Sequence, residues 1–309
     1  MITVFGSVNV DLTFRHPHLP SVGETVLTPT FTAAVGGKGA NQAIAAARDG
    51  AHTSFIGCIG NDSWGETARQ ALVAAGIDTG GLQTVPGATG LAVVLIDADG
   101  RNQIAVASGA NEALQADSLL RRETPPGIQT CLLLQRETPA SEVEAAIAHA
   151  KGKRVKVILN LAPALPLSAA ALRQVDVLVL NEHEATVLGR FLALPHTQAA
   201  EQVVALAREL GNTVIITLGG EGAVAARNDE VWRVEALPVG AIDTTGAGDC
   251  FVGVLAAALV RGASLPVALQ RAAVAGSLAC TIVGAMPSFP SGEQIDAALA
   301  EAKHTQSRG

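Results

Sequence analysis

The sequence predicts an α/β fold with three layers, in which helices flank a mostly parallel central sheet and a small antiparallel β flap forms a lid. Three observations predict it. Short apolar runs alternate with longer Ala-rich segments of helical spacing. Two segments alternate apolar and polar residues without helical spacing, and the chain from Asp243 onward is nearly all helix-compatible. We expect one domain over residues 1–309.

The central strands are predicted from runs rich in β-branched residues or leucine. These are residues 2–5, 53–59, 131–134, 155–159, 177–180 and 214–218. Between them, residues 39–50, 64–76 and 140–152 have helical spacing, and each of these segments ends on glycine. Strands that alternate with helices are typical of a parallel sheet covered on both faces.

Two segments interrupt this alternation, at about residues 11–35 and 87–108. The second contains Asp99-Gly100, a dipeptide that favours a tight hairpin turn. We expect both segments to form antiparallel strands beside the main sheet, as a flap over the functional site.

Composition excludes several classes of protein. The chain has 309 residues, 49% hydrophobic and 16% charged, which is enough apolar sequence for a large core. Its net charge of −7 argues against nucleic acid as a partner. The longest apolar runs are too short to span a membrane, and no signal peptide is evident. Four widely spaced cysteines, with no CxxC pair, are read as free thiols of a cytoplasmic protein.

The stretch DTTGAGD at residues 243–249 carries the clearest chemical signal. Gly246, Ala247 and Gly248 precede an apolar helical pattern, and small residues at a helix start leave backbone N–H groups open to an anion. Asp249 lies in the first helical turn, where it could take a proton from a substrate hydroxyl. Taken alone, the stretch could equally be a turn with a capping aspartate.

Two N-terminal motifs offer polar side chains for a ligand. In GGKGANQA, Gly37 permits close backbone approach, and Lys38 and Asn41 lie on the first helical turn, although a tight strand-to-helix turn explains the glycines nearly as well. In GSVNVDL, Asn9 and Asp11 have strand spacing and point to one side at the end of the first strand. An amide and a carboxylate suit a polyol, and the alternative is an Asx turn.

NEHEA follows a predicted strand and places Asn181 and Glu184 three residues apart. On a helix the two side chains would share one face, where they could hold water-coordinated magnesium or phosphate. The alternative is an N-cap with acidic residues in the first helical turn.

These motifs, with TLGGEGA near residue 217, occur in the order found in PfkB-type carbohydrate kinases. The chain resembles that family from its first strand to its last helix, and most resembles its ribokinase-like branch. GRNQIAVASGAN, LLLQRETP and GAMPSFPS extend the likeness. The resemblance implies a three-layer ribokinase-like fold and phosphoryl transfer from ATP to the terminal hydroxymethyl of a pentose. Among the pentoses, D-ribose is the first candidate.

The resemblance also implies roles for individual residues. Asp249 would be the general base, and the backbone of residues 245–248 the anion hole. The positions that match the sugar contacts are Asn9, Asp11, Gly37, Lys38, Asn41, Ala92, Ile104, Glu137 and Asp249, with Ala92 and Ile104 as an apolar cover on the flap.

Cofactor positions follow in the same way. Nucleotide contacts match Asn181, Glu184, Thr217, Leu218, Gly219, Gly220, Gly222, Gly248 and Ala273, and Glu184 would reach Mg²⁺ through water. A potassium site would resemble Asp243, Thr245, Ala279, Ile282, Gly284 and Ser288. Subunits of such kinases join through their flaps, so the resemblance implies a homodimer.

The chain departs from the family pattern at three places. Ala273 and Ile282-Val283 replace residues that are often polar and basic, and Arg136 stands where an apolar residue is usual. Other members of the family that act on fructose, deoxyribose or nucleosides remain alternatives, as does a catalytically silent sugar-binding regulator. An aromatic content of 3% disfavours a nucleoside kinase. The lack of GxGxxG after the first strand excludes a nicotinamide oxidoreductase.

Overall fold

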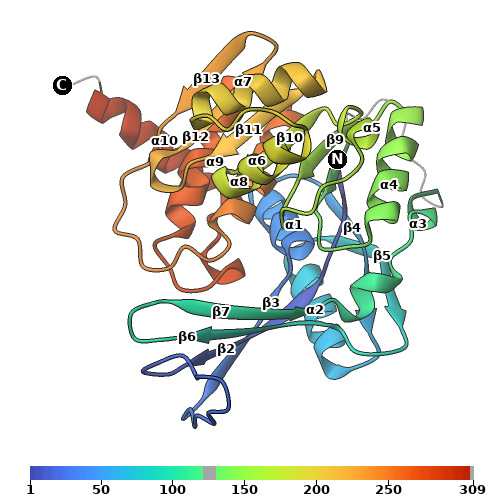
Figure 1. The fold of residues 1–309 in the computed structure, drawn as a ribbon, viewed down its shortest axis with the longest axis vertical. Helices are drawn as coiled ribbons and strands as arrows, with labels where there is room; N and C mark the ends of the chain where they lie inside the picture. The colour runs from blue at the N-terminus through green and yellow to red at the C-terminus, as the bar shows by residue number, and fades with distance from the viewer. Residues whose placement is uncertain (121–129, 307–309) are drawn as a thin grey trace.

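A computed structural model describes residues 1–120 and 130–306. Within them, one large sheet of nine strands runs through the molecule in the order β13-β12-β11-β10-β9-β8-β1-β4-β5 (Figure 1). All neighbours pair in parallel except β11·β12 and β12·β13, which are antiparallel. The strands are β1 (Ile2–Phe5), β4 (Thr53–Gly60), β5 (Asp78–Val85), β8 (Cys131–Leu134), β9 (Lys156–Asn160), β10 (Val177–Asn181), β11 (Thr213–Thr217), β12 (Ala223–Arg227) and β13 (Glu230–Val234).

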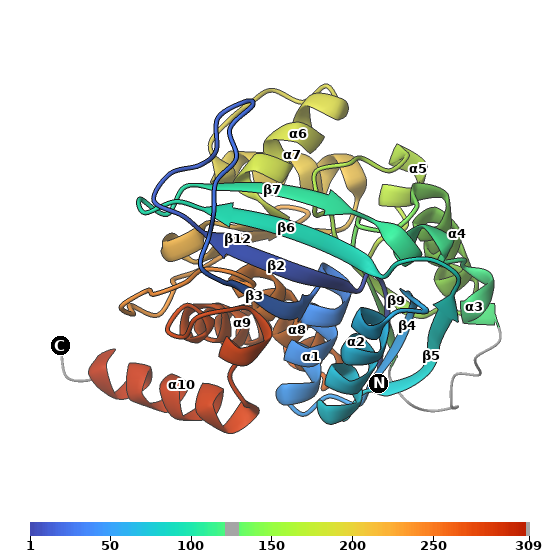
Figure 2. The same ribbon diagram turned by 90° about the horizontal axis from the view of Figure 1, so that it is seen from below.

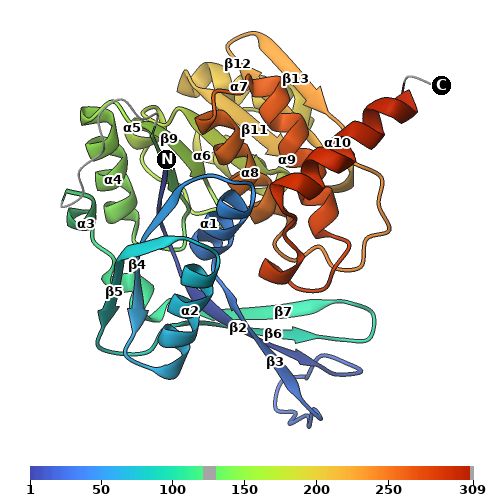
Figure 3. The same ribbon diagram turned by 180° about the vertical axis from the view of Figure 1, so that it is seen from behind.

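Helices cover both faces of this sheet, as Figure 3 shows from behind, and a separate hydrophobic core lies on each face. The first core is built with α1 (Lys38–Arg48), α2 (Ser63–Ala74), α8 (Ala247–Val260), α9 (Leu265–Ala279) and α10 (Gly292–Gln306). The second is built with α3 (Asp117–Leu120), α4 (Ala140–Gly152), α5 (Ala169–Leu172), α6 (Glu182–Phe191) and α7 (Ala199–Leu210). Alternate residues of each strand enter opposite cores, which explains the continuous apolar runs of the sequence.

A second sheet of four strands, in the order β3-β2-β6-β7, projects from the main body (Figure 2). Its strands are β2 (Asn9–Arg15), β3 (Phe31–Gly36), β6 (Gly90–Ile96) and β7 (Asn102–Ala107). The two hairpins are antiparallel as predicted, and the second turns at Gly100 with φ of 81°. They join through a parallel β2·β6 pair, because both strands leave the main sheet in the same direction.

The predicted central strands and helices are confirmed, with ends shifted by a residue or two. One detail of the prediction was wrong. Asn9 and Asp11 lie at the beginning of β2 in the flap and not at the end of β1, because the chain breaks its extended run at Gly6–Val8. All four cysteines are free thiols, as expected.

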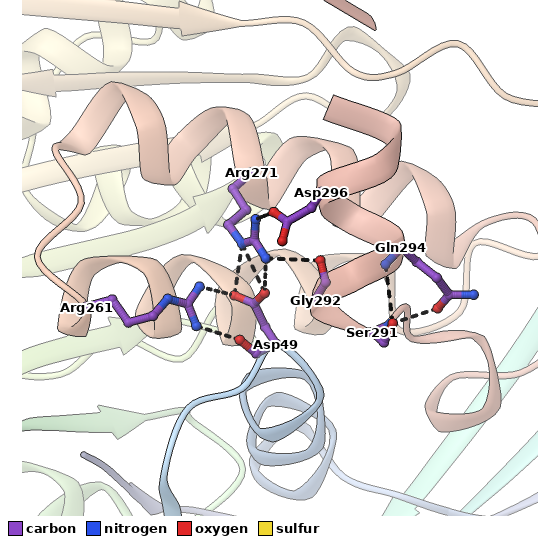
Figure 4. A network of polar contacts seen from close by, with 7 residues as sticks. All are labelled: Asp49, Arg261, Arg271, Ser291, Gly292, Gln294 and Asp296. Carbon is purple, nitrogen blue, oxygen red and sulfur yellow. Dashed lines mark hydrogen bonds and ion pairs between the residues drawn. The ribbon is translucent and has the colours of Figure 1, made fainter. Parts of the chain in front are cut away.

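The helices of the first core are tied together at a buried carboxylate (Figure 4). Asp49, which follows α1, is 4% exposed and accepts hydrogen bonds from Arg261 after α8 and Arg271 of α9. Arg271 also binds Asp296 of α10. In the described part of the chain, no helix has the length and apolar character needed to cross a bilayer.

Candidate active site

Asp249 lies in the first turn of α8, near the carboxyl ends of the parallel strands, and it is 8% exposed. It does not cap its helix: the N-cap residue is Gly246, with φ of 76°, a conformation that favours glycine. Its carboxylate instead accepts hydrogen bonds of 2.9 Å from Asn41 to Oδ2 and of 2.9 Å from Gln42 to Oδ1, both from α1. The capping alternative is therefore excluded, and the carboxylate is held as a hydrogen-bond acceptor.

The start of α1 brings a second group of polar side chains to the same place. Lys38 shares a small cavity with Asp249 and Glu184, and Glu137 accepts a 2.9 Å hydrogen bond from the Lys38 backbone N–H. The carboxylate of Asp249, followed by those of Glu137, Glu184 and Asp11, raises the pKa of the Lys38 ammonium against the effect of its burial. The site thus holds one half-buried ammonium among several carboxylates, a cluster of titratable groups with perturbed pKa values that is typical of a functional site.

Asp11 faces Gly36, and a Cβ atom at Gly36 would lie 2.3 Å from the Asp11 Oδ2 atom. Burial, with smaller contributions from the carboxylates of Glu137 and Asp249, raises the pKa of Asp11 to about 6. Gly37 has a φ of 87°, and a Cβ atom at this position would lie 2.7 Å from the backbone nitrogen of Asn9. At both glycines, neighbouring atoms of the chain occupy the space that a Cβ atom would need, which favours the alternative of a tight strand-to-helix turn.

Sequence reasoning missed three polar residues that organise this site, all of them buried. Gln42 binds Asp249, Ser7 donates a 2.7 Å hydrogen bond to Glu137, and Asn111 donates a 2.8 Å hydrogen bond to the Asn9 Oδ1 atom. Because Asn111 occupies that oxygen, Asn9 presents its N–H₂ group to a ligand. The signal for Gln42 and Asn111 was their position inside the quoted motifs GGKGANQA and GRNQIAVASGAN.

Asn181 and Glu184 form a capping box at the start of α6. The Asn181 Oδ1 atom accepts from the Glu184 backbone N–H at 2.8 Å, and the Glu184 Oε2 atom accepts from the Asn181 backbone N–H at 2.8 Å. The N-cap interpretation is correct, yet both residues also line the cavity beside Asp249. Burial raises the pKa of Glu184, although the Asn181 hydrogen bond and the Lys38 ammonium oppose the shift.

A larger cleft of about 760 Å³ opens next to this cavity, bounded by α6, α8, α9 and the loop after β11. Its walls combine glycines with apolar side chains, as a flat aromatic ligand with a phosphate tail requires. Among the predicted nucleotide contacts, Asn181, Thr217, Gly219, Gly220, Gly222, Gly248 and Ala273 line it. Leu218 lies in the same loop but is absent from the lining, and its backbone N–H donates to the Gly222 carbonyl.

Asp243 lies on the loop before α8, and its hydrogen-bond partners differ from those of Asp249. Its Oδ1 atom accepts from the Thr245 backbone at 2.9 Å, and its Oδ2 atom accepts from the Gly284 backbone at 2.9 Å. Burial acts to raise the pKa of Asp243, but hydrogen bonds from the Thr245 hydroxyl and from these two backbone N–H groups together lower it. Near it, Ser288 donates to the Ala285 carbonyl, Ala279 is buried and Ile282 is 51% exposed. The hydrogen bond from Gly284 joins the loop of Asp243 and Thr245 to the segment after α9, which carries Ile282 and Ser288, while Ala279 is the last residue of α9.

The flap residues differ in their surroundings. Ala92 is buried and pairs with Asp11 across the β2·β6 ladder, whereas Ile104 on β7 is 57% exposed and absent from the cavity beside Asp249. Arg136, which departs from the family pattern, has a structural role. Its buried guanidinium donates to the carbonyls of Leu165 and Thr138 at 2.9 and 2.7 Å. It therefore fastens the loop after β9 and needs no ligand.

An acid at an open helix N-terminus, a neighbouring ammonium and an adjoining cleft for a nucleotide define a small-molecule kinase. The chain belongs to the PfkB family of carbohydrate kinases, whose description, "pfkB family carbohydrate kinase", matches residues 1–292. The ribokinase of Haemophilus influenzae is 39% identical, with 95% of this chain and 96% of the relative covered. The deoxyribokinase of Salmonella typhi is 33% identical, with 96% of this chain and 97% of the relative covered.

The fold agrees with solved structures as well. The ribokinase of Arabidopsis thaliana, solved in complex with ribose and ATP, matches with a TM-score of 0.85 and 32% identity, over 96% of this chain and 98% of that one. The fold is therefore that of the ribokinase-like kinases, and the enzyme is a phosphotransferase that acts on a carbohydrate alcohol.

Proposed function

We propose that the protein is an ATP-dependent ribose kinase that transfers the γ-phosphoryl group to the terminal hydroxymethyl of D-ribose and releases ribose 5-phosphate. The observation that carries the proposal is the Asp249 carboxylate, held at the N-terminus of α8 between the polar residues of α1 and the nucleotide cleft. The ribokinase of Haemophilus influenzae, 39% identical over nearly the whole chain, supports ribose as the sugar.

In this mechanism the sugar lies against Asn9, Asp11, Lys38, Asn41 and Glu137, with its hydroxymethyl at Asp249. The carboxylate accepts the hydroxyl proton as the oxygen attacks the γ-phosphorus, and ADP leaves into the adjoining cleft. The backbone N–H groups at residues 246–248 face the charge that develops on the phosphoryl oxygens. Ala92 closes the apolar side of the sugar, and Ile104 would approach it when the flap closes.

Glu184 suits a magnesium site, because a buried carboxylate and the neighbouring Asn181 line the cavity between the nucleotide cleft and Asp249. Bound Mg²⁺ would neutralise charge on the ATP phosphates, and Glu184 would hold its water ligands. Asp243 is the charged residue that would hold potassium. Its Oδ1 and Oδ2 atoms accept from the Thr245 and Gly284 N–H groups, and a carboxylate keeps further lone pairs for a large monovalent cation. Through its loop, Asp243 would keep the start of α8 in place.

Deoxyribose is the second candidate substrate, because the deoxyribokinase of Salmonella typhi is 33% identical to this chain. A coupled ADP-release assay over ribose, deoxyribose, fructose and nucleosides, with and without potassium, decides between them. We expect the highest kcat/KM with ribose. Phosphorylation of every sugar except ribose would overturn the substrate and leave the kinase standing. Sugar binding without any ADP release would indicate a regulator. A cytoplasmic location remains a prediction from the sequence.

A further inference from the structure

Gln42, the residue after Asn41 in α1, is fully buried yet makes three side-chain hydrogen bonds. Its Nε2 atom donates to the Asp249 Oδ1 atom and to the Asn160 Oδ1 atom, each at 2.9 Å. Its Oε1 atom accepts from the Gln135 Nε2 atom at 2.7 Å. These bonds join the catalytic acid of α8 to residues that follow β8 and end β9, through one side chain of α1.

We propose that Gln42 is the positioning residue of the catalytic base, and that a buried chain of amides orients it. The proposal rests on the proposed function, in which Asp249 takes the substrate proton. Gln42 does not line the cavity beside Asp249, so it acts on the site through its two acceptors that do, Asp249 and Asn160. A double-mutant cycle with Asp249 separates these two routes.

The orientation of each amide follows from a backbone carbonyl at the end of the chain. The Asn160 Nδ2 atom donates to the Val179 carbonyl of β10 at 3.2 Å, and a carbonyl can only accept. The Asn160 oxygen must then face Gln42, so Gln42 must present its N–H₂ group. A flipped Gln42 would set its oxygen against the oxygens of both Asp249 and Asn160.

Together with Asn41, this amide holds the carboxylate at both oxygens. Asn41 binds Oδ2 and Gln42 binds Oδ1, and consecutive residues of one helix supply the two donors. The carboxylate cannot rotate about its terminal bond without losing a hydrogen bond in a buried site, where the loss is large. Its remaining acceptor positions are therefore kept at a constant direction toward the substrate hydroxyl.

Stability alone does not explain the chain of amides. The Gln135 Oε1 atom is buried, and the described residues give it no hydrogen-bond partner. An unpaired buried oxygen destabilises a fold, and apolar side chains of similar shape would avoid it. Among the described residues, the Gln135 side chain is hydrogen-bonded through its N–H₂ group, which donates to Gln42.

The test compares Gln42→Met, which keeps the length of the side chain and removes the donor, with Gln202→Met as the matched control. Gln202 is a helical glutamine of α7, is 3% exposed and lies away from the sugar site. For Gln42→Met we expect kcat to fall about 10- to 100-fold while KM for the sugar stays within about threefold, because the base is misplaced and the sugar contacts remain. Gln202→Met should keep the wild-type kcat.

A double-mutant cycle separates positioning from general damage. With Asp249→Asn already present, adding Gln42→Met should lower kcat by less than about threefold, because no base remains to be placed. An equal loss in both backgrounds, or wild-type kcat in folded Gln42→Met, would overturn the proposal. Equal losses in Gln42→Met and Gln202→Met would do the same.

If Gln42→Met does not fold, Gln135→Met takes its place, with an expected kcat loss of about 3- to 10-fold, and wild-type kcat there would overturn the proposal. The wild-type enzyme tests the proposed function separately. If another sugar is the better substrate, only the ribose assignment fails and the cycle is measured with that sugar. A wild-type chain that turns over no sugar would overturn both.

Discussion

Asn41 donates a 2.9 Å hydrogen bond to the carboxylate of Asp249 across a separation of 208 residues in the chain. The bond joins the first turn of α1 to the first turn of α8, and with the bond from Gln42 it links the motif proposed to bind the sugar to the motif proposed to bind the phosphate. An acid held in this way, next to a nucleotide cleft, has a single chemical task in the proposed mechanism. The first prediction removes that task.

Replacing the base should abolish turnover while sparing substrate binding. For Asp249→Asn, which keeps the shape and one acceptor oxygen, we expect kcat to fall about 10²- to 10⁴-fold and the KM for ATP to change little. Steady-state kinetics with purified enzyme measure both constants. Turnover near the wild-type rate would contradict the assignment of Asp249 as the base.

Asp11 should lower the stability of the folded protein as the pH rises. Burial raises its pKa to about 6, above the usual value of 3.8 for an aspartate, so the folded state disfavours the carboxylate. The stability that the protonated Asp11 contributes is complete below pH 3.8, decreases as the pH rises from 3.8 toward 6, and is lost above about pH 6. Asp11→Asn cannot ionise, and its Tm relative to wild type should therefore be higher near pH 8 than near pH 4.

Thermal unfolding of both proteins at the two pH values gives this difference, and a Tm difference that does not change with pH would contradict it. The same variant should bind the sugar less well, because the carboxylate accepts hydroxyl hydrogen bonds that the amide N–H₂ group cannot. A gain in stability with a loss of binding would be typical of a residue kept for function.

Asp49 should be a major determinant of stability, because its side chain neutralises two arginines in a buried network (Figure 4). Asp49→Ala removes the carboxylate that both guanidiniums share and leaves Arg271 with Asp296 and Arg261 with a backbone carbonyl. Because these partners remain and Arg261 is partly exposed, we expect a cost of about 3 kcal/mol, the lower end of the range for a broken buried pair. The control is Asp229→Ala, which removes an ion pair to Arg208 whose side chains are 80% and 65% exposed, and which should cost about 1 kcal/mol or less. Denaturant unfolding compares them, and equal effects would contradict the prediction.

Asp243 should control activation by potassium and not the chemical step. In Asp243→Ala the Gly284 and Thr245 N–H groups lose their acceptor, and the proposed potassium site loses its carboxylate. We expect the rate without potassium to stay near that of the wild type, and added potassium to raise it no further. The measurement is initial rate against potassium concentration, with choline chloride to hold the ionic strength constant. A normal potassium response in the variant would place the cation elsewhere.

The flap should join two copies of the chain. Its edge strands expose Phe31, Ile104 and Val106 at 50%, 57% and 55%, which is costly for an isolated small sheet. Light scattering should give a dimer for the wild type and a monomer for Ile104→Asp. Exchange of Val267 for Asp, on the exposed side of α9 and 58% exposed, is the control and should leave the dimer intact. A wild-type monomer at working concentration would contradict the prediction.

Local pattern was sufficient for most of the fold. The apolar runs at residues 53–59 and 214–218 became β4 and β11 because strands buried on both faces carry a continuous apolar sequence. The Ala-rich segment after Gly37 became α1 because the glycine, with φ of 87°, ends the strand and frees the first turn. The periodicity of apolar residues does not indicate whether two strands pair in parallel or antiparallel. The parallel β2·β6 pair between the two flap hairpins was therefore not predicted.

The sequence predicted the proposed reacting groups of the site, but not the residues that hydrogen-bond to them and hold them in place. By itself, the sequence determined the elements, the free thiols and, through its motifs, the acid, ammonium and glycine turns of a carbohydrate kinase. Only the tertiary structure decided that Gln42, Ser7 and Asn111 hold Asp249, Glu137 and Asn9, and that Arg136 fastens a loop. The physical reason is that a buried amide or hydroxyl takes its role from the partner it meets, and these partners lie about 100 to 200 residues away in the chain.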